Sequence, residues 1–334
     1  MTNNPKIYIV TEGGGDIGYG HLMRCLSLCQ AFAEKNIAPV MLIDSDGAKV
    51  KLNQFPNAEM LAWHKNLDLL YNHIKDADVV IVDSLLAPES LWTDIHNYCK
   101  VAVLLDDFIR RKHVKGVVVD WTVLADQKFY QEQNHDVTYL LGTKYTALRQ
   151  EFWDIPPKQI SPTLTNILVT FGGSDVANMT PLVVELLKSH YPHADVKVII
   201  GPGFTNLKEI EGLAYLSCEL IMQPSASEMV KLMLWADVCI SAGGQTFYEL
   251  ARVGTPTIGV QVADNQRDDV SGWTATGFLQ FAGEADDPNI KQEIANQLDH
   301  LANFELREKV SKIGQTQIDG QGARRLVKAI LEEA

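Results

Sequence analysis

A glycine-dense stretch near the N-terminus constrains this chain more than any other feature. It runs from Thr11 to Leu28, with five glycines between Gly13 and Gly20. The β-branched and aromatic run before it, Lys6 to Val10 (KIYIV), predicts a buried strand, and apolar residues at helical spacing from Leu22 to Phe32 predict a helix. The pattern therefore predicts a strand, a glycine turn and a helix start. In parallel α/β sheets, ligands bind outside the carboxyl ends of the strands, where this glycine turn is predicted to lie.

His21 opens the predicted helix. The loop lacks the third glycine of a dinucleotide-binding fingerprint and the Lys-Ser/Thr pair of a P-loop. It offers instead an imidazole at a helix N-terminus, where the helix dipole disfavours protonation and keeps a neutral base available near pH 7. Two interpretations of His21 stay open, a catalytic base and a capping or packing histidine.

Length, charge and cysteine usage narrow the class of protein. A chain of 334 residues favours two domains, and a net charge of −13 argues against nucleic acid or an anionic membrane as the main partner. The five cysteines form no C-x-x-C pair, which favours reduced thiols, a cytoplasmic setting and no bound zinc. Neither a signal peptide nor an apolar run long enough for a membrane span is found, so we expect neither.

Apolar runs alternate with helical segments along the first half. Strands are predicted at 39–43, 77–83 and 98–105, with a further strand at 116–120 on the sheet edge, and this alternation is typical of a parallel sheet buried on both faces. Carboxylates follow these strands at Asp83, the Asp106-Asp107 pair and Asp120. Aspartates commonly form caps and turns there, and we favour this for Asp83 and Asp120. The Asp106-Asp107 pair is placed on the ligand side of the sheet.

A double proline at 156–157 marks the predicted domain boundary. We expect an N-terminal Rossmann-like domain at 1–157 and a C-terminal one at 158–334, whose last helix packs back on the first domain. The second half repeats the alternation, with a strand at 166–171, a turn at Gly172-Gly173 and a helix at 179–189. The last segment, 319–330, is predicted to be helical.

A third combination of strand, glycine loop and helix begins near residue 236. Backbone N–H groups and side-chain donors there suit a phosphate group, and the residues concerned are Ser241, Gly243, Gly244, Gln245 and Thr246. Glu249 lies further along the helix, where a carboxylate suits two ribose hydroxyls. The alternative for Glu249 is a solvated helix face.

Two α/β domains with glycine turns at strand ends are typical of GT-B enzymes, which hold a nucleotide sugar between their domains. More specific motifs follow in order at 17–24 (IGYGHLMR), 148–152, 172–178, 241–244, 263–266 and 319–322. Together they resemble the UDP-sugar hydrolases of the pseudaminic acid pathway. Those enzymes act on UDP-2,4-diacetamido-2,4,6-trideoxy-β-L-altropyranose and are similar to the N-acetylglucosaminyltransferase that forms lipid II. The resemblance spans nearly the whole chain.

The resemblance implies a role for several residues. His21 would activate or orient the water that attacks the anomeric carbon, and Asn265 would place the sugar or that water. Glu249 would hold the ribose, the Gly243-Gly244 turn the diphosphate, and backbone near Met222 or Gln223 the uracil. The substrate-binding set is completed by Gly18, Gly20, Arg24, Asp106, Gly172, Gly173 and Gln266. No cofactor or metal is implied, and other enzymes of the same pathway are the expected protein partners.

The chain departs from the family pattern at three positions. Thr11-Glu12-Gly13 stands where the family commonly has Arg-x-Asp, Asp83-Ser84-Leu85 replaces Asp-x-Tyr, and Asp120 replaces an asparagine. These positions line the sugar side of the expected site, so a related nucleotide sugar stays open. A GT-B glycosyltransferase, in which His21 deprotonates an acceptor hydroxyl, is the alternative enzyme. A binding protein without catalysis is the alternative outside enzymes, against which His21 and Asn265 together argue.

Overall fold

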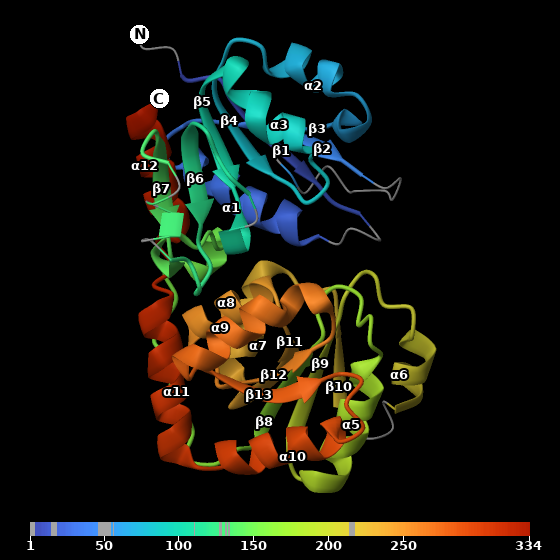
Figure 1. Cartoon of the computed structure of the whole chain (residues 1–334). Helices are drawn as coiled ribbons and strands as arrows, with labels where there is room; N and C mark the ends of the chain where they lie inside the picture. Colours follow the sequence, from blue (N-terminus) through green and yellow to red (C-terminus); the bar gives the residue numbers. More distant parts are fainter. Residues whose placement is uncertain are drawn as a thin grey trace. The chain divides into compact units, whose positions relative to one another are not determined.

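The computed structural model of the chain describes residues 4–14, 19–45, 55, 57–109, 111–126, 129–130, 132, 134–213 and 218–334. The chain forms two compact units (Figure 1). Unit 1 combines residues 1–150 with 320–334, and unit 2 holds residues 151–319. The double proline at 156–157 therefore lies inside unit 2, and the chain returns to unit 1 for its last segment.

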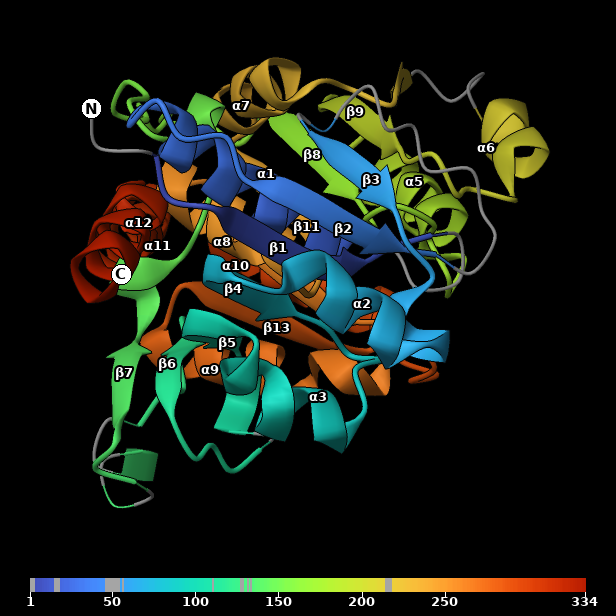
Figure 2. The same cartoon turned by 90° about the horizontal axis from the view of Figure 1, so that it is seen from above.

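Unit 1 contains a seven-stranded parallel sheet in the order β3-β2-β1-β4-β5-β6-β7. Figure 2 shows these strands from above. Their bounds are β1 Ile7–Glu12, β2 Val40–Asp44, β3 Ala58–Met60, β4 Ala77–Asp83, β5 Cys99–Leu105, β6 Gly116–Asp120 and β7 Val137–Leu141. The inner strands are almost fully buried, as their apolar runs predict.

Helices cover both faces of this sheet. The α-helices are α1 Gly20–Ala33, α2 Leu67–Ile74, α3 Glu89–Asp94 and α12 Gly322–Glu333, and the short 3-10 turns are η2 Trp63–Lys65, η3 Ile95–Asn97, η4 Asp107–Ile109 and η5 Thr143–Tyr145. Leu70 of α2 and Leu91 of α3 share one core cluster with Val10 and Val82. Alternate strand residues point to the other face, where α1 contacts β1 and α12.

The last helix is fastened to unit 1 at its first turn. A Cβ on Gly322 would lie 2.1 Å from the carbonyl oxygen of Thr146, so only glycine lets the two backbones approach this closely. Arg324 donates through Nε and Nη2 to the carboxylate of Glu34 on the chain after α1, at 2.9 and 2.7 Å. The Asp-Gly-Gln-Gly motif at 319–322 thus carries the tight junction that returns the chain to unit 1.

Unit 2 contains a six-stranded parallel sheet in the order β10-β9-β8-β11-β12-β13. Its strands are β8 Asn166–Thr170, β9 Asp195–Ile200, β10 Cys218–Met222, β11 Val238–Ala242, β12 Thr257–Gln261 and β13 Leu279–Glu284. Its helices are α5 Met179–His190, α6 Leu207–Leu213, α7 Ala226–Trp235, α8 Gln245–Val253, α9 Arg267–Thr276, α10 Ile290–Leu301 and α11 Phe304–Gln317, with 3-10 turns η6 Gln150–Phe152 at the border with unit 1 and η8 Asp264–Gln266. α5 and α10 share a core cluster with the strands, whereas α8 contacts β11 and α11.

The edges of the sheets differ most from the sequence-based expectation. The strand at 116–120 was expected at a sheet edge, but β6 lies inside the sheet because β7 pairs with it on the outer side. β3, β7 and β13 were not predicted. β13 (LQFAGE) is only partly buried and pairs across a register shift at Gly259/Val260, so no continuous apolar run marks it.

All five cysteines are free thiols. Within the described part of the chain, no helix combines the length and apolar character needed to cross a bilayer. Across the same residues, no group of three or more His, Cys, Asp or Glu side chains is arranged to hold a metal ion.

Candidate functional site

Acidic residues end the strands of unit 1 along one edge. Glu12, Asp44, Asp83 and Asp120 are the last residues of β1, β2, β4 and β6, and Asp106 follows β5 directly. All five are buried, with exposed fractions of 2% or less. Because parallel strands bring their carboxyl ends to one edge, these carboxylates line the edge from which α1 also starts.

His21 is held at this edge by Asp83. Its Nδ1 lies 2.7 Å from Asp83 Oδ1, and the histidine side chain is 14% exposed while that of Asp83 is fully buried. Arg24 Nη2 also lies 3.3 Å from Nδ1, but a guanidinium has no acceptor atom. The Nδ1–H of His21 therefore donates its hydrogen bond to Asp83. This tautomer leaves Nε2 as a proton acceptor, and Nε2 has no hydrogen-bond partner among the residues that the structure describes.

Arg24 ties two carboxylates into the same network. Its guanidinium donates to Asp83 through Nη2 and, at 2.6 Å, through Nε, and it donates to Asp107 Oδ2 at 2.5 Å. The guanidinium lies 5.2 Å from the ring of Trp121. The charge of Arg24 is thus committed to protein carboxylates, and its contribution to the edge is to fix Asp83 and hence His21.

The electrostatics of this network keep Asp83 ionised. Burial alone would raise the pKa of Asp83, but the charge of Arg24 and the hydrogen bonds from Arg24 and His21 outweigh it and hold the pKa well below its ordinary value. Asp120 behaves in the opposite way, because burial and the nearby Asp107 raise its pKa to about 6. Asp120 accepts hydrogen bonds from the backbone N–H groups of Phe108 and Thr122, at 3.1 and 2.9 Å.

Asp106 and Asp107 separate in the structure. Asp106 is fully buried and its Oδ2 contacts His113 Nε2 at 2.8 Å and the Arg111 N–H at 3.0 Å. The adjacent Asp107 is the member of the pair that reaches Arg24. Both acids thus lie at the carboxyl end of β5, where the side chain of Asp106 is fully buried and hydrogen-bonded within unit 1.

Glu12 supports the loop after β4. Its Oε1 accepts the backbone N–H groups of Leu85 and Leu86, at 2.5 and 3.2 Å, and the Ser84 hydroxyl accepts the Ala87 N–H at 2.8 Å. Leu85 and Leu86 are nevertheless 49% and 45% exposed. The segment at 84–87 is thus a fixed turn that presents two leucine side chains.

Unit 2 has its glycine loop before α8 at the same type of edge. Gly244 has a φ of 103°, a conformation that favours glycine, and a Cβ there would meet nothing within 4 Å. Gln266 links the ends of β11 and β12, because its Nε2 donates to Gly243 O at 3.4 Å and its Oε1 accepts the Val262 N–H at 3.0 Å. Gly243 and Gln266 are therefore in contact at the carboxyl ends of β11 and β12.

The two glycine-preceded helices of unit 2 differ in their N-terminal capping. Asp175 accepts the N–H groups of Met179 and Thr180 at 2.9 and 3.0 Å, so a carboxylate already occupies the start of α5. In α8 the N-cap residue is Gly244, which has no side chain to cap the helix, and the first turn holds no acidic residue. Since a helix N-terminus favours an anion, the start of α8 suits phosphate, whereas the start of α5 already holds a carboxylate.

The Gly172-Gly173 loop of unit 2 packs closely against the loop after β9. A Cβ on Gly201 would lie 2.4 Å from Gly173 O, and Gly203 N donates to the same oxygen at 2.8 Å. Gly172 and Gly173 themselves are exposed. Ser241 is fully buried and its hydroxyl donates to Ala242 O at 2.9 Å, so its side chain does not reach the surface.

The other predicted site residues lie at the same edge of their own unit. Gly20 is the first residue of α1, and a Cβ there would meet nothing within 4 Å. Gln245 and Thr246 open α8, Glu249 is 6% exposed on the same helix, Asn265 is exposed in η8, and Met222 ends β10 with 53% exposure. Gly18 lies outside the described residues.

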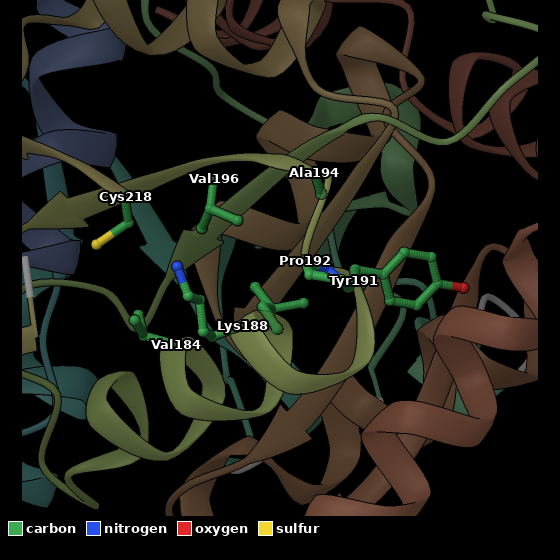
Figure 3. A pocket seen from close by; sticks show the side chains of 8 residues that line it. Val184, Lys188, Tyr191, Pro192, Ala194, Val196 and Cys218 are labelled. Carbon is green, nitrogen blue, oxygen red and sulfur yellow. The ribbon is translucent and has the colours of Figure 1, made fainter. Parts of the chain in front are cut away.

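A small pocket with a cavity volume of about 20 Å³ lies elsewhere in unit 2 (Figure 3). Val184 and Lys188 of α5 line it together with Val196 of β9 and Cys218 of β10. Cys218 is the first residue of its strand, so this pocket lies toward the amino ends of the strands. It is thus separate from the glycine loops, which lie at the carboxyl ends.

The fold defines the class of protein. Two parallel α/β units with these sheet orders form the GT-B fold, as in Acinetobacter baumannii MurG, whose structure matches with a TM-score of 0.65 and 14% identity over 98% of this chain and 100% of that chain. Residues 166–271 match the model of the glycosyltransferase family 28 C-terminal domain. That match contains the glycine loops before α5 and α8.

Two relatives are similar in sequence. An uncharacterized protein of Methanocaldococcus jannaschii is 30% identical over 277 residues, covering 79% of this chain and 57% of that protein. The Helicobacter pylori pseudaminic acid cytidylyltransferase and UDP-2,4-diacetamido-2,4,6-trideoxy-beta-L-altropyranose hydrolase is 24% identical over 255 residues, covering 75% of this chain and 43% of that protein. The chain thus spans about half the length of these relatives.

Two groups of residues were missed or undervalued at the level of sequence. Asp83 was interpreted as a cap or turn residue, although it is the partner of His21. Asp44 forms a second carboxylate–histidine pair with His64, which no motif indicated. A signal existed, because almost every apolar strand of the first half is followed by an acid at its carboxyl end.

Proposed function

We propose that this chain is a UDP-sugar hydrolase that breaks the anomeric C–O bond and releases UDP and the free sugar. The single observation that carries the proposal is the His21–Asp83 pair, in which a buried carboxylate fixes Nδ1 and leaves Nε2 as an acceptor at the ligand edge of unit 1. The start of α8, which follows a glycine and has no acidic residue in its first turn, supports the nucleotide part. The H. pylori relative supports the choice of UDP-2,4-diacetamido-2,4,6-trideoxy-β-L-altropyranose or a close relative as substrate.

The proposed reaction needs a base and a stabilised leaving group. His21 Nε2 takes a proton from water, the water oxygen bonds to the anomeric carbon, and the bond from that carbon to the β-phosphate oxygen breaks. The electron pair leaves with UDP, whose negative charge is stabilised by the backbone N–H groups at the start of α8. Glu249 is proposed to bind the ribose, Met222 backbone the uracil, and Asn265 the sugar or the water.

The test is turnover of a panel of UDP-sugars in ¹⁸O-labelled water with a chelator and without acceptor. We expect UDP and free sugar, with the label in the sugar because the C–O bond breaks. Label in UDP would contradict the proposed bond cleavage. His21→Ala should retain UDP binding and lose at least about a hundredfold in rate, as removal of a general base does. His73→Ala is the matched control, because His73 lies on α2 with a surface carboxylate, Glu59, at 3.2 Å.

A glycosyltransferase is the second candidate, and the family 28 match of residues 166–271 favours it. In that case His21 Nε2 takes its proton from an acceptor hydroxyl, and the acceptor oxygen replaces water at the anomeric carbon. The same panel separates the two activities. UDP-sugars that stay intact in water and release UDP only when sugar acceptors are added would establish transfer.

A further inference from the structure

A second histidine of unit 1 is held at a strand end by a buried carboxylate. His64 lies in η2, and its Nδ1 contacts Asp44 Oδ2, which also accepts the backbone N–H of His64 at 2.9 Å. Asp44 ends β2 and is 2% exposed, whereas the His64 side chain is 26% exposed. Asp44 accepts a hydrogen bond from Nδ1–H of His64, and Nε2 of His64 makes no hydrogen bond within the part of the chain that the structure describes.

The surroundings fix the orientation of the His64 ring. The preceding Trp63 is fully buried and donates its indole N–H to Thr11 O at 3.1 Å, which ties η2 to β1. The Trp63 and His64 rings meet edge to face with centroids 6.1 Å apart. Asp44 Oδ1 accepts the Ser45 N–H at 2.8 Å, so both carboxylate oxygens are engaged. A partly exposed imidazole is therefore held in one orientation and one tautomer.

His64–Asp44 repeats the construction of His21–Asp83 on the other side of β1. β2 and β4 both pair with β1, with Asp44 opposite Glu12 and Asp83 opposite Thr11. Since neighbouring strands lie about 4.8 Å apart, the backbones of the two aspartates are about 10 Å apart along the edge. One monosaccharide with its substituents spans such a distance. Both partly buried imidazoles are thus held by strand-end carboxylates at the same edge of the sheet, on the two sides of β1.

We propose that His64 is a substrate-contacting residue that recognises a hydrogen-bond donor on the sugar, and that Asp44 is its positioning residue. The inference rests on the proposed function and assigns to it a further specificity determinant. With its proton on Nδ1, the His64 ring offers a lone pair at Nε2, so it selects a hydroxyl or an amide N–H and not a carbonyl oxygen. A sugar that presents only an acceptor at this position is disfavoured, because it leaves Nε2 desolvated and unpaired.

The test combines kinetics with binding. For His64→Ala we expect kcat/KM for a turned-over UDP-sugar to fall about five- to tenfold, the effect of one lost hydrogen bond, while the affinity for UDP alone is unchanged by calorimetry. Asp44→Asn should give a smaller loss with an altered His64 tautomer, measured by ¹⁵N NMR of the ring. His73→Ala, the surface histidine control, should change neither quantity. Comparing an N-acetylated sugar with its hydroxyl analogue distinguishes an amide from a hydroxyl donor.

The outcomes separate this inference from the proposed hydrolysis. An unchanged kcat/KM in His64→Ala, or an equal loss of UDP and UDP-sugar binding, overturns the role of His64 even if the wild type hydrolyses its substrate. If the UDP-sugar binds without being turned over, the proposed hydrolysis is wrong. The role of His64 is then tested by the NMR signals of its ring in the wild-type protein. Its NMR signals should shift on addition of the UDP-sugar and not of UDP, and signals that stay in place in both cases overturn it.

Discussion

Asp83→Asn removes one negative charge from the interior of unit 1 with almost no change in shape. Asp83 is fully buried and accepts hydrogen bonds from Arg24 Nε at 2.6 Å and from His21 Nδ1 at 2.7 Å. Removal of one partner from a buried ion pair costs about 3–5 kcal/mol, because the remaining charge is left uncompensated. Arg24 keeps Asp107 as a second partner, so we expect a loss at the lower end, about 3 kcal/mol.

The same strand provides the control. Asp78 lies near the other end of β4 and accepts hydrogen bonds from the Lys6 N–H at 2.7 Å and from Lys100 Nζ at 2.6 Å. The Lys100 side chain is 70% exposed, so the ion pair is largely solvated. Asp78→Asn should therefore cost about 1 kcal/mol or less.

The pH dependence of the loss has a defined sign. Burial would raise the pKa of Asp83, but Arg24 and His21 hold it below the value of the unfolded chain. A depressed pKa contributes stability that is present above pH 4 and is lost as the pH falls through the folded-state pKa, so the gap between wild type and Asp83→Asn should shrink in acid. Hydrogen exchange of the β4 amides reports the opening of unit 1. A cost below 1 kcal/mol at pH 7, or a gap that persists in acid, would refute this reasoning.

Two further predictions concern a tightly packed glycine of unit 1 and a buried lysine of unit 2. Gly322→Ala should destabilise unit 1 by about 1–3 kcal/mol and speed hydrogen exchange in α12, because the new Cβ overlaps the Thr146 backbone. Gly212→Ala in α6 is the control. A Cβ there meets nothing within 4 Å, so the free energy of unfolding should stay the same or rise by up to about 1 kcal/mol. Equal effects would contradict the packing account. Burial lowers the pKa of Lys158 to about 8, so the unfolded state binds the extra proton between pH 8 and 10. Denaturation should show wild type gaining up to about 3 kcal/mol relative to Lys158→Met over that range, and a flat difference would count against it.

The sequence predicts most of the inner strands because burial on both faces leaves continuous apolar runs. β4 was expected at 77–83 and is found at Ala77–Asp83, and α5 was expected at 179–189 and is found at Met179–His190. Outer strands are half solvated and carry no such run, so β7 and β13 were missed. The position of β6 inside the sheet could not be inferred either, because it depends on pairing with β7.

The site is predictable where the information is local. His21 at the start of α1 and Gly244 at the start of α8 follow from a strand, a glycine turn and a helix in succession. The partner of His21 could not be assigned in this way, because Asp83 lies 62 residues further along the chain. Whether a strand-terminal acid caps a turn or binds a distant histidine depends on tertiary contacts, and the same holds for Asp44 and His64.

The return of residues 320–334 to unit 1 affects the order of folding on the ribosome. All of unit 2 is translated before α12, the helix that covers α1, so unit 2 can fold co-translationally as a continuous segment. Unit 1 cannot complete its packing until α12 leaves the ribosome, because the apolar face of α1 stays uncovered until Leu326 and Ile330 of α12 are available. A nascent chain stalled before Gly320 is therefore the form of this protein most in need of a chaperone.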